Sequence, residues 1–358
     1  MDGKTPKYVN LANWIKEKIC ADNLRAGDKF YTENELSKMF NVSRQTVRQA
    51  ISVLEKENVL EGRQGSGTFL ADKSNVKRVT SKTIGVIITY FDDYIFPSII
   101  KGIETVLSNN GYSMQLACTH NNVENESRAL ISMMDNNIAG FIIEPTKSAL
   151  PNSNKKWFDE IEKMGTPILF LNAYYPEMKF PYVALDDVAA GKMAAQYLID
   201  NGHTKIAAAL KSDDIQGHLR YKGIVQALQQ GGIESAAENV FWYTTEDIKY
   251  IADDFPRLRR YIADCTALVC YNDKLASIVA MALKKNGIAV PEQLSIISID
   301  NSDLATVCEV PLTSVAHPKK ELGIVAATNM LKMVETYKFD ATVKFEPKLV
   351  ERKSVKTL

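Results

Sequence analysis

Two amphipathic segments and a tight turn between them make up residues 32–54, TENELSKMFNVSRQTVRQAISVL. Thr32 and Glu35 have the spacing of a capping box, which predicts the start of a first helix. After a turn at Asn41, Ser43 is the expected cap of a second helix. Each segment carries apolar residues at helical spacing: Leu36, Met39 and Phe40, then Val47, Ala50, Ile51 and Leu54. Two short helices joined in this way predict a helix-turn-helix.

The sequence on both sides of this unit completes a small domain. Residues 7–21 carry an apolar stripe typical of one helix, with Val9, Ala12, Ile15 and Ile19 on one face. Residues 58–70, NVLEGRQGSGTFL, have two apolar pieces around a glycine-rich turn, which predicts a β-hairpin. A phosphate-binding loop would have to open a helix, and here the chain continues as a strand. We therefore interpret the hairpin as a wing beside the helix-turn-helix.

Long polar side chains lie on the outward face of the second helix, near its N-terminus. They are Arg44, Gln45, Arg48 and Gln49. A recognition helix meets base edges and phosphates at this position. The alternative is an ordinary solvated helix face.

The order and spacing of these motifs resemble the winged helix of GntR-family regulators. The matching motifs are Thr32-Glu-Asn-Glu-Leu36, Val42-Ser-Arg-Gln-Thr-Val-Arg-Gln-Ala50 and Gly65-Ser-Gly-Thr-Phe69. The resemblance implies DNA contacts from Lys7, Tyr8, Glu33, Ser43, Arg44, Gln45, Thr46, Arg48, Gln64 and Gly65. Glu33 would either accept a hydrogen bond from a cytosine amino group or orient Arg44.

Charge is distributed unevenly along the 358 residues, although the net charge is zero. Residues 1–82 hold 15 Lys and Arg against 10 Asp and Glu, whereas the remainder holds 28 against 33. A basic head on an acidic body favours an anionic partner at the head. Residues 73–82 are polar and basic without periodicity, so the expected organisation is a DNA-binding domain at 1–72, a linker at 73–82 and a larger domain at 83–358.

The composition also predicts the compartment. No apolar run approaches the roughly 20 residues of a membrane helix, and the first residues lack the apolar core of a signal peptide. The five cysteines are odd in number and scattered. These features predict a cytoplasmic protein with reduced cysteines and no membrane partner.

From residue 83 onward, apolar strand-like runs alternate with helical segments. Expected strands are 83–90, 113–118, 140–144, 167–172, 205–210, 267–271 and 294–300, and a helix is expected at 96–109. This alternation predicts an α/β fold with parallel sheets covered on both faces. About 275 residues is large for one such sheet, so two lobes are expected.

Ligands of α/β folds bind at the carboxyl ends of the strands, and polar and aromatic residues follow these strands. The segments are 90–96 (YFDDYIF), 144–147 (EPTK), 172–175 (NAYY), 271–273 (YND) and 300–302 (DNS). Arg220 is expected on a loop after the strand at 205–210. A neutral sugar requires paired hydrogen bonds to its hydroxyl groups and an aromatic ring against its C–H groups. The alternative for each Asp or Asn is helix capping.

The larger domain resembles the effector domain of LacI/GalR regulators, which is similar to periplasmic sugar-binding proteins. The matching motifs include Asn201-Gly-His-Thr-Lys-Ile206, Arg220-Tyr-Lys-Gly223, Cys270-Tyr-Asn-Asp273 and Val290-Pro-Glu-Gln-Leu-Ser-Ile296. By position, the resemblance implies that Arg220, Asn272 and Asp300 hold sugar hydroxyls. It also implies that Phe96 stacks on the sugar ring and that Glu144 is a polar contact in the first lobe. His317 falls on a crossover segment near the ligand. The other expected effector contacts are Tyr94, Lys147, Asn172, Tyr174 and Asp186.

A GntR-type head on a LacI-type body resembles the arabinose repressors of Gram-positive bacteria. That resemblance implies L-arabinose as effector, a pseudo-palindromic operator, a homodimer formed through the body and release from DNA on sugar binding. The same architecture could respond to another small sugar or act as an activator. An enzyme is not expected, because the sequence has no nucleophile elbow, Walker loop or metal-ligand spacing, and no cofactor is expected. A transport binding protein is disfavoured by the winged helix.

Overall fold

The computed structural model describes residues 7–21, 24, 27–56, 59–63, 66–71, 81–91, 94–234, 239–336 and 339–358. Internal contacts divide the chain into two units, Met1–Thr80 and Ser81–Leu358. The division falls within the predicted linker, of which residues 73–80 lie outside the described part of the chain. We describe each unit by itself and refer to them as the head and the body.

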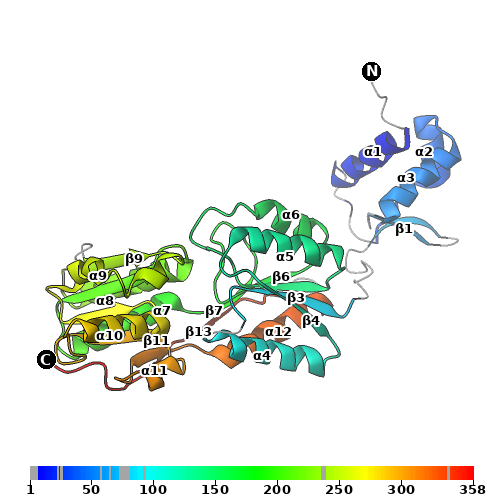
Figure 1. The fold of residues 1–358 in the computed structure, drawn as a ribbon. Helices are drawn as coiled ribbons and strands as arrows, with labels where there is room; N and C mark the ends of the chain where they lie inside the picture. The colour runs from blue at the N-terminus through cyan, green and yellow to red at the C-terminus, as the bar shows by residue number, and fades with distance from the viewer. Residues whose placement is uncertain are drawn as a thin grey trace. The chain divides into compact units, whose positions relative to one another are not determined.

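The head is a winged helix-turn-helix (Figure 1). Its elements are α1 (Lys7–Ala21), α2 (Glu33–Phe40), α3 (Arg44–Lys56), β1 (Leu60–Arg63) and β2 (Gly67–Leu70). The predicted capping box forms, since the Thr32 side chain accepts from the Glu35 N–H and Glu35 accepts from the Thr32 N–H. The apolar faces of the three helices meet the wing strands in one core that includes Ile15, Leu36, Val47 and Leu54.

The first lobe of the body is a parallel sheet of order β13-β7-β6-β5-β3-β4. Helices α4 and α12 cover one face, and α5 and α6 cover the other (Figure 1). The elements are β3 (Thr83–Ile88), α4 (Phe96–Asn109), β4 (Ser113–Cys118), α5 (Val123–Asp135), β5 (Gly140–Ile143), α6 (Lys155–Lys163), β6 (Ile168–Leu171), β7 (Tyr182–Leu185), α12 (Lys319–Glu335) and β13 (Val343–Phe345).

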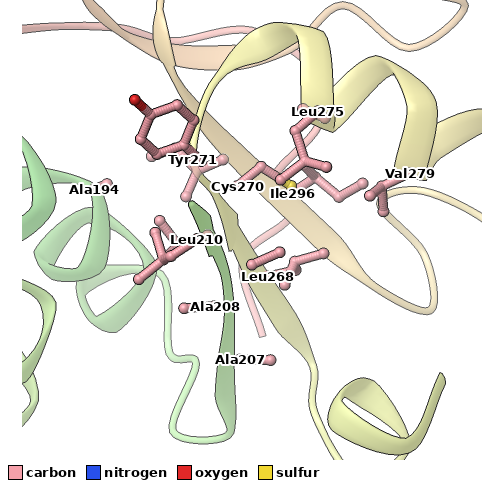
Figure 2. Close-up of a cluster of buried hydrophobic side chains, with 14 of the residues drawn as sticks. Ala194, Ala207, Ala208, Leu210, Leu268, Cys270, Tyr271, Leu275, Val279 and Ile296 are labelled. Atoms are coloured by element: carbon pink, nitrogen blue, oxygen red, sulfur yellow. The ribbon is translucent and has the colours of Figure 1, made fainter. Parts of the chain in front are cut away.

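The second lobe has the sheet order β14-β12-β11-β10-β8-β9, in which only β14 is antiparallel to its neighbour. Figure 2 shows its core, with Ala194 of α7 and Leu275 of α10 on opposite sides of β8 and β10. The elements are α7 (Asp187–Asp200), β8 (Ile206–Lys211), α8 (Ile215–Gln230), β9 (Val240–Tyr243), the 3-10 turn η3 (Asp247–Tyr250), α9 (Phe255–Ile262), β10 (Ala267–Cys270), α10 (Asp273–Lys285), β11 (Ser295–Asp300), α11 (Leu304–Val307), β12 (Thr313–Ala316) and β14 (Lys348–Val350).

The chain passes between the two lobes three times: from β7 to α7, from β12 to α12 and from β13 to β14. In the second lobe, α7 and α8 pack closely because glycines remove side chains from their interface. A Cβ on Gly191 would lie 2.1 Å from the Arg220 carbonyl oxygen, and one on Gly223 would lie 2.0 Å from the Val188 carbonyl oxygen. This close approach fixes the position of the middle of α8.

The predicted fold class is confirmed: a winged helix precedes an α/β body with two mostly parallel sheets. Arg220 departs from the prediction, since it lies within helix α8 and not on a loop. No helix among the described residues is both long enough and apolar enough to cross a membrane.

Candidate functional site

A cavity of about 140 Å³ lies between the two lobes of the body. Its walls come from residues at the carboxyl ends of β3, β5 and β6 in the first lobe and of β8, β10 and β11 in the second. At roughly 10–15 Å³ for each water-sized position, the volume accommodates about ten such positions. A small ligand therefore fits.

Arg220 forms the centre of the second-lobe wall and is completely buried. Its Nε donates to Asp187 Oδ1 at 2.8 Å, and its Nη1 donates to the Tyr271 carbonyl oxygen at 2.5 Å. The guanidinium carbon lies 4.5 Å from the centre of the Tyr271 ring, and Nη2 lies 3.7 Å from Asp300 Oδ1. The side chain is thus fixed on three sides, with donor capacity left toward the cavity.

Burial and the ion pairs act in opposite directions on these groups. Burial raises the pKa of Asp187 to about 6, although Arg220 lowers it. Burial is also the main reason that the pKa of Asp300 is raised, again against the influence of Arg220. For Arg220, burial opposes the charged form, but Asp187 and Asp300 outweigh it and raise the pKa. The Arg220 guanidinium therefore remains charged and compensates the carboxylates of Asp187 and Asp300.

The start of α10 supplies an amide to the cavity. Asn272 caps this helix, since its Oδ1 accepts from the Leu275 N–H at 3.0 Å, and it also lines the cavity. The next residue, Asp273, is buried and accepts from three serine hydroxyl groups, those of Ser298, Ser302 and Ser314. Both expectations for Asn272, capping and a position at the cavity, are met by the same side chain.

The first-lobe wall is built around Glu144. Its carboxylate accepts from the Thr89 N–H and from Asn172 Nδ2, both at 2.8 Å. Burial raises the pKa of Glu144, although these hydrogen bonds lower it. Tyr90 and Phe96, with ring centres 5.8 Å apart, add an aromatic surface beside the polar groups.

Tyr94 connects the two walls. Its hydroxyl donates to Asp300 Oδ2 at 2.7 Å and accepts from the Asp273 N–H at 3.1 Å. The backbone of Tyr94 is left-handed, with φ of 67°, which is uncommon outside glycine. Carboxylate, guanidinium, amide and aromatic groups thus converge on one enclosed space that can hold a small polyhydroxylated molecule.

Comparison with known proteins identifies both parts of the chain. Residues 7–70 match the family model of bacterial regulatory proteins of the gntR family, and residues 195–355 match a periplasmic binding protein-like domain. The chain is 39% identical to the arabinose metabolism transcriptional repressor of Halalkalibacterium halodurans, with 97% of this chain and 96% of that protein covered. It is 38% identical to the repressor of the same name from Geobacillus stearothermophilus, over 99% and 98% of the two chains.

The chain belongs to the family of arabinose metabolism transcriptional repressors. This regulator also resembles the solved transcription regulator CcpA of Lactococcus lactis, with a TM-score of 0.69 and 27% identity, covering 77% of this chain and all of that one. A cellobiose complex of the regulator CelR has a TM-score of 0.68 at 20% identity, covering 89% and 94% of the two chains, and shows the fold alone. The protein is therefore a regulator and not an enzyme, as the sequence predicts.

The structure brings most of the predicted effector residues to the cavity of this regulator. Those that line it are Tyr94, Phe96, Glu144, Asn172, Arg220, Asn272 and Asp300. Six of them follow or end the strands β3, β5, β6, β10 and β11, as the α/β interpretation predicts, and Arg220 reaches the cavity from helix α8. Their contact with a ligand remains a prediction.

The other predicted effector residues lie elsewhere. Lys147 pairs with Glu246 at 2.6 Å, and Asp186 caps α7 by accepting from the Ala189 N–H at 3.0 Å. The Tyr174 ring stacks on Tyr182, with centres 4.5 Å apart, on a separate surface groove. His317 lies behind Asn172, to whose Oδ1 its Nε2 is hydrogen bonded at 2.8 Å. None of these side chains is among the residues that line the cavity, and their contact with a ligand stays a prediction.

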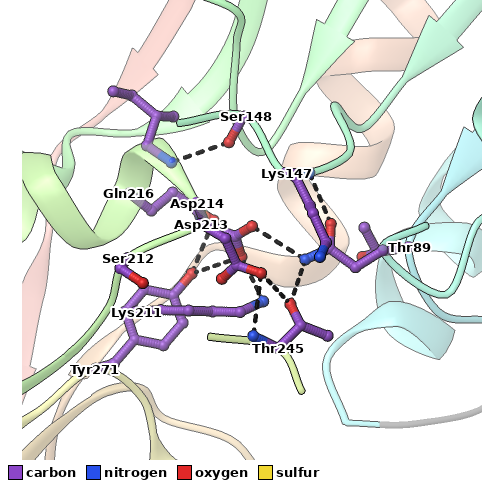
Figure 3. A network of polar contacts seen from close by, with 12 residues as sticks. Thr89, Lys147, Ser148, Lys211, Ser212, Asp213, Asp214, Gln216, Thr245 and Tyr271 are labelled. Carbon is purple, nitrogen blue, oxygen red and sulfur yellow. Dashed lines mark hydrogen bonds and ion pairs between the residues drawn. The ribbon is translucent and has the colours of Figure 1, made fainter. Parts of the chain in front are cut away.

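Sequence reasoning missed several residues of the cavity wall. Lys211 and Asp214 form a nearly buried ion pair of 2.7 Å, and Asp214 also accepts from Tyr271 (Figure 3). Burial opposes the charged form of Lys211, but Asp214 and Asp213 raise its pKa. The position of Lys211 at the end of strand β8 could have predicted its place in the cavity wall. Gln216 and Tyr243 also line the cavity.

The head presents the predicted DNA-contact residues on the exposed side of α3. Ser43, Arg44, Gln45 and Arg48 are exposed, and Ser43 caps the helix through the Thr46 N–H at 3.2 Å. Glu33 pairs with Arg48, Oε2 to Nε at 2.8 Å, so the carboxylate orients Arg48 instead of the predicted Arg44. Lys7 and Tyr8 lie in the first turn of α1, and the predicted wing residues Gln64 and Gly65 lie outside the described residues.

We expect His317 to make the regulator less stable in acid. Burial, followed by Arg220 and Lys319, lowers the pKa of His317 from 6.5 to about 3. Below pH 6.5 the unfolded chain therefore binds a proton that the folded chain does not, so the free energy of unfolding falls as the pH falls. One such group contributes up to about 1.4 kcal/mol per pH unit. Between pH 7 and 5, the free energy of unfolding measured in urea should fall less steeply for His317→Gln than for the wild type. Equal slopes for the two proteins would contradict His317 as the source of the acid sensitivity.

Proposed function

We propose that this protein represses genes of arabinose utilisation and leaves its operator when L-arabinose binds the interlobe cavity. The observation that carries the proposal is the cavity itself, in which Asp300, Arg220 and Asn272 face Glu144 across a space of about 140 Å³. The two repressors of arabinose metabolism to which the chain is similar support this role.

The charges around the cavity support an uncharged sugar. Arg220 is compensated by Asp187 and Asp300, and Lys211 is compensated by Asp214. A phosphate would have to compete with these carboxylates for Arg220 and Lys211, whereas a hydroxyl can donate to a carboxylate and accept from the guanidinium at once. The aromatic pair of Tyr90 and Phe96 offers a surface for the C–H groups of the sugar.

In the proposed mechanism, a homodimer formed through the body presents two heads to a pseudo-palindromic operator. The sugar contacts both lobes, so it binds the closed body more tightly than the open body. A ligand shifts an equilibrium only by its differential affinity for the two states. Closure thereby lowers operator affinity, and the same coupling makes operator DNA lower the affinity for sugar.

The proposal is tested by titrating the full-length protein with pentoses, hexoses and sugar phosphates, by calorimetry and by fluorescence anisotropy on operator DNA. L-Arabinose should bind and release the DNA. Hexoses should bind at least tenfold more weakly, because their additional CH₂OH group does not fit a small closed cavity. Equal binding of glucose or galactose would contradict L-arabinose as the specific effector, and tighter DNA binding with sugar would indicate an activator.

We expect Arg44→Ala and Arg48→Ala each to weaken operator binding by about 1–3 kcal/mol, the value of one good base or phosphate contact. Sugar affinity should not change, because the cavity lies within the body. Arg260→Ala is the matched control, since it removes an exposed arginine from α9 of the body. Gel-shift curves that coincide for all these proteins would contradict the recognition-helix assignment.

A further inference from the structure

Asn121, just after strand β4, connects the two lobes through one side chain. Its Oδ1 accepts from the Lys147 N–H at 2.8 Å within the first lobe. Its Nδ2 donates across the cleft to Thr245 Oγ1 at 2.6 Å and to Asp214 Oδ1 at 3.2 Å. The residue is only 2% exposed. The amide oxygen thus accepts a hydrogen bond within the first lobe, and the amide nitrogen donates to the second lobe.

Two backbone amides near Asn121 also cross the cleft. The Ala149 N–H donates to the Asp213 carbonyl oxygen at 3.2 Å, and the Ile215 N–H donates to Ser148 Oγ at 3.0 Å. Figure 3 shows Asp213, Asp214 and Thr245 of the second lobe beside Lys147 and Ser148 of the first. Each of these bonds requires a closed cleft, so their formation reports closure.

The backbone around Asn121 is held in an unfavourable conformation. His120 and Asn121 are consecutive left-handed residues, with φ of 50° and 53°, and Lys147 has φ of 47°. This region costs free energy for residues other than glycine and persists only where the surroundings hold it. Here it directs the Asn121 amide at Asp214 and Thr245.

Asn121 is not among the residues that line the cavity, whereas its partners Asp214 and Thr245 are. Local capping does not explain it, because Asn122 is the residue that caps α5 through the Glu124 and Asn125 N–H groups. Asn121 therefore bridges the lobes beside the cavity, without lining it.

We propose that Asn121 is a positioning residue that stabilises the closed body and thereby sets the sugar concentration at which the operator is released. This inference rests on the proposed function. The apparent dissociation constant of a ligand is its intrinsic value divided by the fraction of protein in the binding-competent state. Loss of the Asn121 bridge lowers that fraction while the residues that line the cavity stay in place.

The test compares full-length wild type, Asn121→Ala and Asn122→Ala. With Asn121→Ala, half-release of operator DNA should require roughly tenfold to hundredfold more L-arabinose, as expected for the loss of one hydrogen bond to a carboxylate and one to a hydroxyl. Operator affinity without sugar should match the wild type or exceed it. Asn122→Ala, the matched control, should lower only the melting temperature through the lost cap.

Hydrogen exchange provides a readout that needs no sugar. The Ala149 and Ile215 amides should exchange faster in Asn121→Ala than in wild type or Asn122→Ala, because both lose their acceptors when the cleft opens. If L-arabinose does not release the wild-type protein, the proposed function fails, and faster exchange at these amides still supports the bridge. Unchanged exchange together with an unchanged sugar requirement would overturn the inference.

A second variant covers the case in which Asn121→Ala does not fold. Asn121→Asp keeps the shape and the acceptor for the Lys147 N–H but places a carboxylate against Asp214. We expect an even higher sugar requirement, partly reversed when Asp214→Asn is added, because an amide then donates across the same gap. A double-mutant cycle against Asp214→Asn alone measures the coupling, and zero coupling would overturn the inference.

Discussion

Asp300→Ala is expected to keep the repressor on its operator at L-arabinose concentrations that release the wild-type protein. The Asp300 carboxylate is buried at the cavity wall, with Arg220 beside it and Tyr94 donating to it. It can accept from sugar hydroxyls, and each charge-assisted hydrogen bond contributes about 1.5–3 kcal/mol. Sugar affinity should therefore fall roughly tenfold to several hundredfold. Titration and operator release on the same purified protein measure both effects.

The alternative is that Asp300 serves the following helix only. The structure disfavours it, because Asp303 occupies the N-cap position of α11. Asp303→Ala is therefore the matched control, an exposed aspartate three residues away whose loss should leave sugar affinity unchanged. Normal release of Asp300→Ala by L-arabinose, with a lowered melting temperature alone, would remove Asp300 from the proposed binding site.

Arg220→Met should have the largest effect on stability. It leaves Asp187 buried without its cation and removes one charge from beside Asp300. Breaking a buried ion pair by removing one partner typically costs about 3–5 kcal/mol. The variant should also lose measurable sugar binding, because the guanidinium is the cation at the centre of the cavity wall.

Urea unfolding followed by circular dichroism measures this loss. Lys222→Met, on the same helix but exposed, is the control and should change the free energy of unfolding by no more than about 0.5 kcal/mol. Adding Asp187→Asn to Arg220→Met should restore part of the stability, since it removes the uncompensated charge. Equal stability of Arg220→Met and wild type would contradict the role of the buried pair.

The sequence predicted the elements whose signals are local. The capping box at Thr32, the glycine-rich hairpin and the apolar run at 83–90 each act within a few residues, and the structure has the expected element at each place, with the strand ending at Ile88. The predicted helix at 96–109 also has the observed bounds. The polar residues that follow the strands could also be located, because the end of an apolar run is visible in the sequence.

The placements that the sequence did not indicate depend on tertiary contacts. Nothing local to Tyr174 or Asp186 shows that the first stacks on Tyr182 and the second caps α7. Arg220 was expected on a loop, because a buried arginine inside a helix needs partners such as Asp187 that lie far away in sequence. Five strands of three or four residues each were not predicted, namely β7, β9, β12, β13 and β14.

The three chain crossings between the lobes have a consequence for how such a protein changes during evolution. Because three segments share one junction, we expect the relative motion of the lobes to be mainly a hinge rotation about that junction. Any molecule that fills the cavity and contacts both walls then drives the same rotation. Substitutions in the cavity wall can therefore change which effector binds while the rotation of the lobes stays the same. Ligand specificity and the conformational response can thus evolve separately.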